Sequence, residues 1–238
     1  MKIALIGYGK MGKTIERLAK TKGHDIVLII DKDNLQDFTK ENLQKADVAI
    51  EFSQPESAFE NIKKCLEAKL PVITGTTGWL DKLSEARQIC EQTGSAMIQA
   101  TNFSIGVNLF FALNCYLAKM MNGQPQYEVK IEETHHMQKL DAPSGTAISL
   151  AKDILNEIER KTQWVNHETN NPEELTIISK RIDPAPGTHE VTYHSTIDTI
   201  KITHEAHSRE GFALGAIAAA EWIVGKQGFF TMQDVLGF

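Results

Sequence analysis

The sequence predicts an α/β protein in which a Rossmann-type parallel sheet is joined to a second part, of α+β type, with a mixed sheet. Apolar runs alternate with helical patterns over the first part of the chain. A Gly-x-Gly-x-x-Gly pattern stands between the first apolar run and the first helical pattern, as in dinucleotide-binding units. Beyond residue 104, polar and apolar residues alternate, which is typical of half-exposed strands.

Five strands separated by helices are expected in the first part. Buried strands are predicted at residues 2–6, 25–31, 46–52, 72–74 and 96–100. Helices are predicted directly after the glycine pattern and at residues 56–68 and 80–93. Because strands and helices alternate without hairpin turns, the strands should form a parallel sheet with helices on both faces.

The second part is expected to hold a mixed sheet and few helices. Helices are predicted at residues 105–121 and 146–160, and strands at residues 127–133, 174–181, 189–195 and 199–204. The polar stretch 161–172 is predicted to be a surface loop, and the alanine-rich segment 211–224 a helix that packs back on the first part. Two domains follow from this pattern, one of residues 1–104 with 209–238 and one of residues 105–208.

The composition is that of a globular protein with a sizeable core. Of 238 residues, 42% are hydrophobic and 24% are charged. The net charge of −6 gives no support to nucleic acid or a membrane surface as a partner, and the apolar segment 211–224 is too short to cross a bilayer. Cys65, Cys90 and Cys115 fit no zinc spacing, so we expect buried free thiols in a reducing cytoplasm.

The glycine pattern predicts the site of a nicotinamide cofactor, NADH or NADPH. It comprises Gly7, Tyr8, Gly9, Lys10, Met11 and Gly12. Its glycines allow a tight turn, close approach of the backbone to the pyrophosphate, and close packing of helix on strand. Asp31 ends the second strand, where a carboxylate binds the adenosine ribose and favours NADH. Lys32 would either pair with the extra phosphate of NADPH or be a solvated loop lysine.

Two further loops are expected on the cofactor's side of the sheet. They consist of Gly75, Thr76 and Thr77 after the fourth strand, and of Ala100, Thr101, Asn102 and Phe103 after the fifth. Ligands of open α/β sheets bind outside the carboxyl ends of the strands. Ordinary turns are the alternative interpretation, and the glycine pattern is what favours the cofactor.

Residues 132–147 place imidazoles, a lysine and a helix start close together. The candidate proton carriers and anion binders are His135, His136 and Lys139, followed by a turn with Ser144, Gly145 and Thr146. Free backbone N–H groups at a helix start bind carboxylates and phosphates. The run therefore predicts a site that binds a small anion and moves a proton on it.

Metal binding and structural hydrogen bonding are alternative roles for His135 and His136. Adjacent histidines at a strand end point in opposite directions, so two separate roles are favoured over two bonds to one ion, and no metal is expected. Structural hydrogen bonding is the other alternative. His204 and His207 have no acidic or thiol partner at metal spacing and are interpreted as surface or core histidines. Asp141 or Ser144 would cap the following helix, which leaves other N–H groups free.

The chain resembles the 4-hydroxy-tetrahydrodipicolinate reductase (dihydrodipicolinate reductase) family over essentially its whole length. The strongest match is Glu133-Thr134-His135-His136-x-x-Lys139-x-Asp141-x-Pro143-Ser144-Gly145-Thr146-Ala147. Supporting matches are the glycine pattern, Glu51-Phe52-Ser53, Gly75-Thr76-Thr77-Gly78, Asn102-Phe103-Ser104-x-Gly106-Val107-Asn108, Ile202-Thr203-His204-x-Ala206-x-Ser208-Arg209 and Asp234-Val235-Leu236.

The resemblance implies reduction of 4-hydroxy-tetrahydrodipicolinate to tetrahydrodipicolinate with NADH or NADPH, in the biosynthesis of diaminopimelate and lysine. It implies that His135 is a proton donor or acceptor and that Lys139 is a second proton donor. The dicarboxylate would be held by His136, Ser144, Gly145 and Thr146. Residues 1–104 with 209–238 would bind the nucleotide, and residues 105–208 would bind the substrate and build a homotetramer through their sheet.

Two features depart from the family pattern. The glycine loop is one residue tighter than the family's commoner G-x-x-G-x-M-G, and Arg181-Ile182-Asp183 lacks the glycine usual two places after this arginine.

Two other functions are the alternatives to this reductase activity. Another Rossmann-type dehydrogenase acting on an amino-acid-like dicarboxylate would have no reason for the histidine–lysine run. An inactive nucleotide-sensing module should have lost His135 and Lys139.

Overall fold

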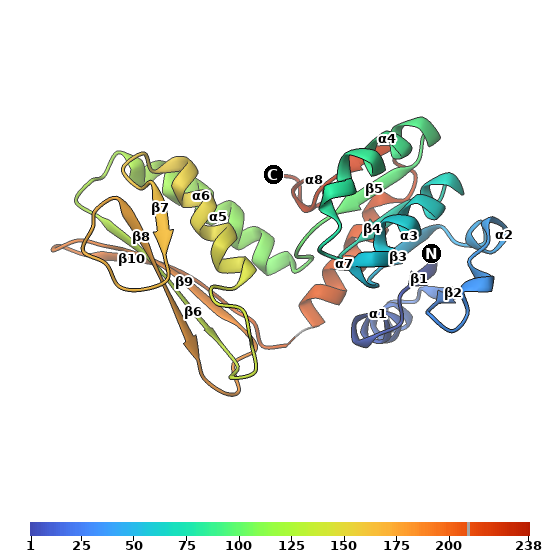
Figure 1. Cartoon of the computed structure of the whole chain (residues 1–238), viewed down its shortest axis with the longest axis horizontal. Coiled ribbons are helices and arrows are strands. Elements are labelled where there is room, and N and C mark those ends of the chain that lie inside the picture. The colour runs from blue at the N-terminus through green and yellow to red at the C-terminus, as the bar shows by residue number, and fades with distance from the viewer. Residues whose placement is uncertain (209) are drawn as a thin grey trace. The chain divides into compact units, whose positions relative to one another are not determined.

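The computed structural model describes residues 1–208 and 210–238, which divide into two compact units (Figure 1). One unit consists of residues 1–105 and 210–238, and the other, within the described residues, of residues 106–208. The domain boundary expected at Arg209, and the family match at that residue, lie outside the described residues. The two units are described separately.

The first unit contains a six-stranded parallel sheet in the order β11-β5-β4-β3-β1-β2. Its strands are β1 (Lys2–Ile6), β2 (Asp25–Ile30), β3 (Val48–Glu51), β4 (Val72–Thr74), β5 (Ala96–Gln99) and β11 (Gly228–Phe230). Its helices are α1 (Lys10–Thr21), α2 (Lys40–Leu43), α3 (Pro55–Glu67), α4 (Leu83–Thr93), α7 (Glu210–Ile223) and α8 (Met232–Leu236). Short 3-10 turns span Leu35–Asp37 and Leu80–Lys82.

Side chains of the first strand alternate between two apolar cores, one on each face of the sheet. Ile3 and Leu5 pack with α1, α7 and α8, whereas Ala4 and Ile6 pack with α2, α3 and α4. Strands buried on both faces read as continuous apolar runs, which is why they are recognisable in the sequence. The parallel sheet predicted with helices on both faces is confirmed.

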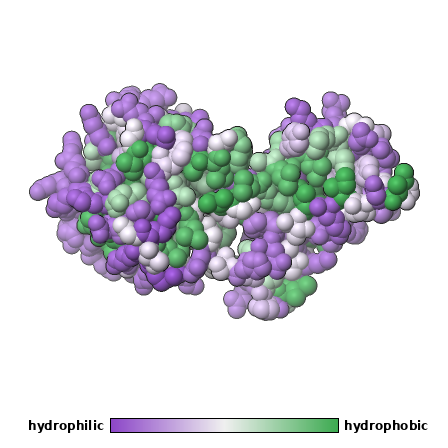
Figure 2. All heavy atoms as spheres, turned by 180° about the vertical axis from the view of Figure 1, so that it is seen from behind, coloured by the Kyte–Doolittle hydropathy of each residue, from purple (hydrophilic) through white to green (hydrophobic). Residues whose placement is uncertain are grey.

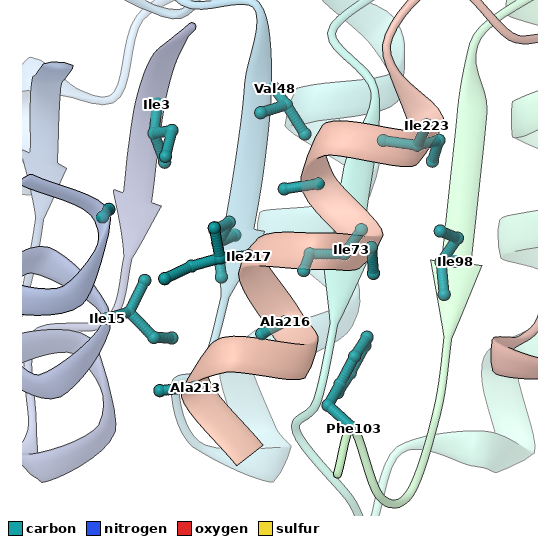
Figure 3. Close-up of a cluster of buried hydrophobic side chains, with 14 of the residues drawn as sticks. Ile3, Ile15, Val48, Ile73, Ile98, Phe103, Ala213, Ala216, Ile217 and Ile223 are labelled. Carbon is teal, nitrogen blue, oxygen red and sulfur yellow. The ribbon is translucent and has the colours of Figure 1, made fainter. Parts of the chain in front are cut away.

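Helix α7 connects the end of the chain to the first core. Ala213, Ala216, Ile217 and Ile223 point from it toward the sheet, where they meet apolar side chains from four strands (Figure 3). Small side chains allow close packing here: a Cβ added at Gly215 would lie 1.7 Å from the Phe103 carbonyl oxygen. The packing of segment 211–224 against the first part of the chain, expected from its alanine-rich pattern, is observed.

The second unit contains a mixed five-stranded sheet in the order β10-β9-β6-β8-β7. Its elements are α5 (Ile105–Asn122), β6 (Glu128–His135), α6 (Gly145–Glu157), β7 (Gln163–Val165), β8 (Glu174–Arg181), β9 (Thr188–His194) and β10 (Thr199–Glu205). The β6 strand pairs antiparallel with β9 and parallel with β8. Val129, Ile131, Leu175 and Val191 form a core with α5 and α6. The mixed sheet predicted for this part is therefore confirmed.

Several local expectations were wrong. The stretch 161–172 is not entirely loop, because β7 lies within it and pairs with β8. The short elements α2, β11 and α8 were not expected. Cys65 and Cys90 are buried free thiols, but Cys115 is only partly buried because it lies on the less covered side of α5. Among the described residues, no helix is both long and apolar enough to cross a membrane.

Candidate active site

The glycine loop follows β1, which lies between β2 and β3 in the sheet. The chain adds β2 on one side of β1 and β3 on the other, so the strand order reverses at this loop. Gly7 has a φ of +94°, and a Cβ there would lie 2.0 Å from the Phe52 carbonyl oxygen. A Cβ at Gly12 would lie 2.4 Å from the Gly7 carbonyl oxygen. Both positions therefore need glycine, and they bring the start of α1 directly against the strand ends.

A cavity of about 680 Å³ opens over this loop. Predicted residues that line it are Gly7, Tyr8, Gly9, Lys10, Met11, Asp31, Lys32, Gly75, Thr76 and Thr77. Helix α1 starts at the cavity without a side-chain cap, so its first N–H groups are free for an anion. The cavity's size, its glycine-rich floor and the carboxylate at the end of β2 fit a nicotinamide dinucleotide.

Other predicted residues lie outside the cavity lining. Gly12 is buried beneath the loop, and Phe103 is buried in the core that contains α7. The structure does not bring Ala100, Thr101 and Asn102 into the lining either. Instead the cavity is lined by residues from the end of β3 and from α3, which sequence reasoning missed: Phe52, Ser53, Gln54, Pro55, Ser57 and Asn61. The Glu51-Phe52-Ser53 motif was the available signal, because it follows a strand adjacent to β1.

In the second unit, the candidate proton carrier His135 is the last residue of β6. Its side chain is buried, and its Nδ1 lies 3.3 Å from Oε2 of Glu133. The ring meets the edge of the His189 ring at a centroid distance of 5.0 Å. A Cβ at Gly187 would lie 3.1 Å from Nε2 of His135, so the backbone approaches closely on that side. The imidazole is thus held on three sides.

Glu133 joins several parts of this site. Both of its oxygens accept the backbone N–H of Ser144, at 3.0 and 3.2 Å, and Arg181 lies 3.5 Å from Oε1. Burial alone would raise the pKa of Glu133, but hydrogen bonds from His135 and Ser144 hold the pKa well below its usual range. Glu133 is therefore a carboxylate, and it connects the strand that carries His135 to the start of α6.

Lys139 and His136 lie on the loop between β6 and α6. The Lys139 ammonium contacts both oxygens of Asp141, at 2.8 and 3.0 Å, and this contact lowers the pKa of Asp141. The loop is fastened by Arg181, which donates to the Asp141 carbonyl oxygen at 2.6 Å, and by Asp183, which accepts the Met137 N–H at 3.0 Å.

Helix α6 starts with the predicted Ser144-Gly145-Thr146 turn. Ser144 is the N-cap, and its hydroxyl accepts the Ala147 N–H at 3.2 Å. This cap leaves the N–H groups of Gly145 and Thr146 at the helix start, where anions bind. A Cβ at Gly145 would meet no atom within 4 Å, so there is open space in front of these donors.

His189 was missed by sequence reasoning, although it completes this cluster. Its Nε2 lies 3.1 Å from the Ser144 hydroxyl oxygen, which also accepts the Ala147 N–H. Burial, together with the nearby His135, lowers the pKa of His189 to about 4. His189 is therefore neutral at pH 7.

The cluster also has the spacing of a metal site, since ligand atoms of Glu133, His135 and His189 lie within 4.8 Å of one another. However, the Glu133 carboxylate already accepts the Ser144 N–H and faces the Arg181 guanidinium. A cation would compete with that guanidinium for the same oxygens. Hydrogen bonding is consequently the better interpretation of these three residues.

We predict that replacing His189 with glutamine reduces the loss of stability in acid. Because the unfolded histidine titrates near 6.5 and the folded one near 4, the wild-type protein loses stability as pH falls through this range. Between pH 7 and pH 5, the expected difference in the free energy of unfolding is about 2 kcal/mol. Urea unfolding at pH 7 and pH 5 measures it. Burial raises the pKa of Asp153 to about 6. Because Asp153 titrates in both proteins, its contribution to the pH dependence cancels in the comparison. Parallel pH profiles would contradict the prediction.

The parallel-sheet unit with its nucleotide cavity defines the protein as an NAD(P)H-dependent oxidoreductase of the Rossmann type. Family models named dihydrodipicolinate reductase, N-terminus and C-terminus, match residues 1–103 and 106–236. The chain therefore belongs to the dihydrodipicolinate reductase family, and the predicted resemblance is confirmed.

Relatives and solved structures agree with this assignment. The chain is 52% identical to 4-hydroxy-tetrahydrodipicolinate reductase of Christiangramia forsetii over 99% of this chain and 98% of the relative. It is 36% identical to the Neisseria gonorrhoeae enzyme of the same name over 82% of this chain and 74% of that one. The dipicolinate-bound dihydrodipicolinate reductase from Paenisporosarcina sp. TG-14 has the same fold, with a TM-score of 0.79, 23% identity and 98% coverage of each chain.

Proposed function

We propose that this protein reduces 4-hydroxy-tetrahydrodipicolinate to tetrahydrodipicolinate with NADH or NADPH, a step in lysine and diaminopimelate biosynthesis. The observation that carries the proposal is the cluster around the start of α6. There Glu133 joins a buried histidine to the start of a helix with free N–H groups, and Lys139 lies on the loop between them, where it pairs with Asp141. A dicarboxylate that must be protonated on reduction suits such a cluster.

The residues proposed to hold the nucleotide line the cavity of the first unit. The N–H groups at the start of α1 would bind the pyrophosphate, and Asp31 would accept hydrogen bonds from the ribose hydroxyls. Gly75, Thr76 and Thr77 flank the cavity from the end of β4. Ala100, Thr101, Asn102 and Phe103 remain candidates that follow β5, with Phe103 acting through packing against Phe52. When bound, the reduced nicotinamide supplies the hydride.

The dicarboxylate is proposed to bind at the start of α6. Its carboxylate would accept the N–H groups of Gly145 and Thr146, while Ser144 caps the helix beneath them. The Lys139 ammonium would exchange its contact with the exposed Asp141 for a substrate carboxylate. His136 would contribute a further donor from the same loop. These cations and dipoles withdraw electron density from the substrate ring, which favours hydride addition.

The proton is proposed to pass through His135. The Glu133 carboxylate lies 3.3 Å from Nδ1 and orients the ring, and Nε2 would be the atom that exchanges a proton with the substrate. Lys139 is the second proton donor. Purified protein assayed with the substrate and each nucleotide tests the function: oxidation of NADH or NADPH that depends on substrate is expected, and its absence with both would contradict the proposal.

We predict that Asp31 sets the cofactor preference. Asp31→Ser should raise the ratio of kcat/KM for NADPH to that for NADH by about tenfold or more, because a charged hydrogen bond to ribose contributes about 1.5–3 kcal/mol. Steady-state kinetics with both nucleotides measures the ratio. Asp33→Ser, which removes an exposed carboxylate outside the cavity lining, is the control. An unchanged ratio would transfer the role to Lys32 or another group.

The protein is further proposed to be a cytoplasmic homotetramer assembled through its second unit. Leu109, Leu113, Tyr116 and Met120 are about half exposed or more and recur at helical spacing on α5. Apolar (green) surface also interrupts the mainly polar (purple) surface in Figure 2. Exposed apolar patches of this kind mark contacts between subunits. Sedimentation of the wild-type protein and of Leu113→Glu would test it, since the substitution should dissociate the assembly if α5 lies in the interface.

A further inference from the structure

A buried carboxyl group lies beneath the nucleotide cavity and has not been given a role above. Glu51 ends β3, and its side chain has no exposure to solvent. Its Oε1 accepts the Ser53 N–H at 3.0 Å, the Thr76 hydroxyl at 3.0 Å and the Ser53 hydroxyl. Its Oε2 accepts the Thr74 hydroxyl at 2.6 Å. Four donors from two adjacent strand ends thus converge on one side chain.

These hydrogen bonds extend to the wall of the cavity. The Thr76 hydroxyl, which donates to Glu51, accepts the Ser53 N–H at 2.9 Å. The Ser53 hydroxyl, which also donates to Glu51, lies 3.1 Å from the Asn61 amide that donates to it. Ser53, Asn61 and Thr76 line the cavity, whereas Glu51 does not. The carboxyl group therefore fixes which way the lining hydroxyls point.

We propose that Glu51 is a positioning residue for the nicotinamide nucleotide, because it holds the loops after β3 and β4 in one arrangement against the cavity. A buried carboxyl group is costly unless it is hydrogen-bonded, and the hydrogen bonds of Glu51 go to Ser53 and Thr76, which line the cavity. The proposal rests on the proposed use of NADH or NADPH. According to the proposal, the atom that positions the two loops is Oε1 of Glu51, which accepts three hydrogen bonds.

Glutamine is the informative substitution at this position. Burial raises the pKa of Glu51, whereas the hydrogen bonds from Ser53, Thr74 and Thr76 oppose this shift. Glutamine has the same shape, keeps an Oε1 that can accept three hydrogen bonds, and carries an amide that can donate to the Thr74 hydroxyl. Methionine has a similar length but no strong acceptor. The pair therefore separates hydrogen bonding from packing.

The experiment compares Glu51→Gln and Glu51→Met by steady-state kinetics and by NADH titration. Glu51→Met should raise the KM and the Kd for NADH about tenfold, which corresponds to about 1.4 kcal/mol, while kcat changes little. Glu51→Gln should retain both constants within about threefold. Wild-type NADH affinity in a folded Glu51→Met variant would overturn the proposal. Loss of affinity in Glu51→Gln equal to that in Glu51→Met would also overturn it, because charge rather than acceptor geometry would then be required.

Controls separate positioning from stability and from the proposed function. Cys65→Ala removes a buried side chain from the core between the sheet and α2, α3 and α4, and Cys65 makes none of the hydrogen bonds to Glu51. This substitution should therefore lower Tm without changing the KM for NADH. If Glu51→Met does not fold, Thr76→Val removes a hydroxyl that donates to Oε1 of Glu51 and accepts the Ser53 N–H, and an unchanged KM for NADH there would overturn the proposal. Failure of the wild-type protein to bind either nucleotide would instead refute the proposed function.

Discussion

The His135→Ala variant is expected to turn over about 10²–10⁴ times more slowly than the wild-type protein, because removal of a general acid or base has this effect. The NADH affinity should stay unchanged, since His135 belongs to the second unit and the glycine loop to the first. Steady-state kcat and an NADH titration measure the two quantities. Near wild-type turnover would remove His135 from the proposed mechanism.

The Lys139→Ala variant is expected to show a decrease of the same order, since Lys139 is proposed both to donate a proton and to bind a carboxylate. Unlike His135→Ala, it should also raise the KM for the dicarboxylate. Lys180→Ala is a suitable control, because Lys180 pairs with Glu132 on the same sheet and takes no part in the proposed site. A similar decrease in that variant would indicate a general effect of charge.

Elements that are buried on both sides were predictable from the sequence, and elements defined by long-range pairing were not. The four residues before Gly7, Ile3 to Ile6, are all apolar because both faces of β1 are covered there. By contrast, β11 and β7 are three-residue strands at sheet edges, and each exists only through pairing with β5 or β8. No local pattern distinguishes such a strand from a loop.

The same distinction applies to the candidate site. The run from His135 to Thr146 was visible because its residues are close in the sequence. His189 reaches this run only because β9 pairs with β6 in a register that places it opposite Glu133. Phe52 and Ser53 reach the glycine loop because β3 lies beside β1. The order and register of strands, which tertiary packing determines, are therefore the information that residue spacing lacks.

The Gly145→Val variant is expected to lose dicarboxylate binding while its fold and NADH affinity are retained. A Cβ at this position meets no protein atom within 4 Å, so the added side chain occupies the open space in front of the helix start. It would block the N–H groups of Gly145 and Thr146. Affinity should fall about 10²-fold or more, because each hydrogen bond to a charged group contributes about 1.5–3 kcal/mol.

Calorimetry with pyridine-2,6-dicarboxylate on the NADH-loaded protein measures this loss. Gly123→Val is a matched control, because a Cβ at Gly123 also meets no atom within 4 Å and this glycine follows α5, away from the start of α6. The control should bind the inhibitor as the wild-type protein does. Intact binding in Gly145→Val would place the carboxylate elsewhere, and the loop residues Lys139 and His136 would then have to hold it without the helix. In that case the hydrogen bond from the Ser144 N–H to Glu133 would have no role in substrate binding, because the start of α6 would not contact the carboxylate.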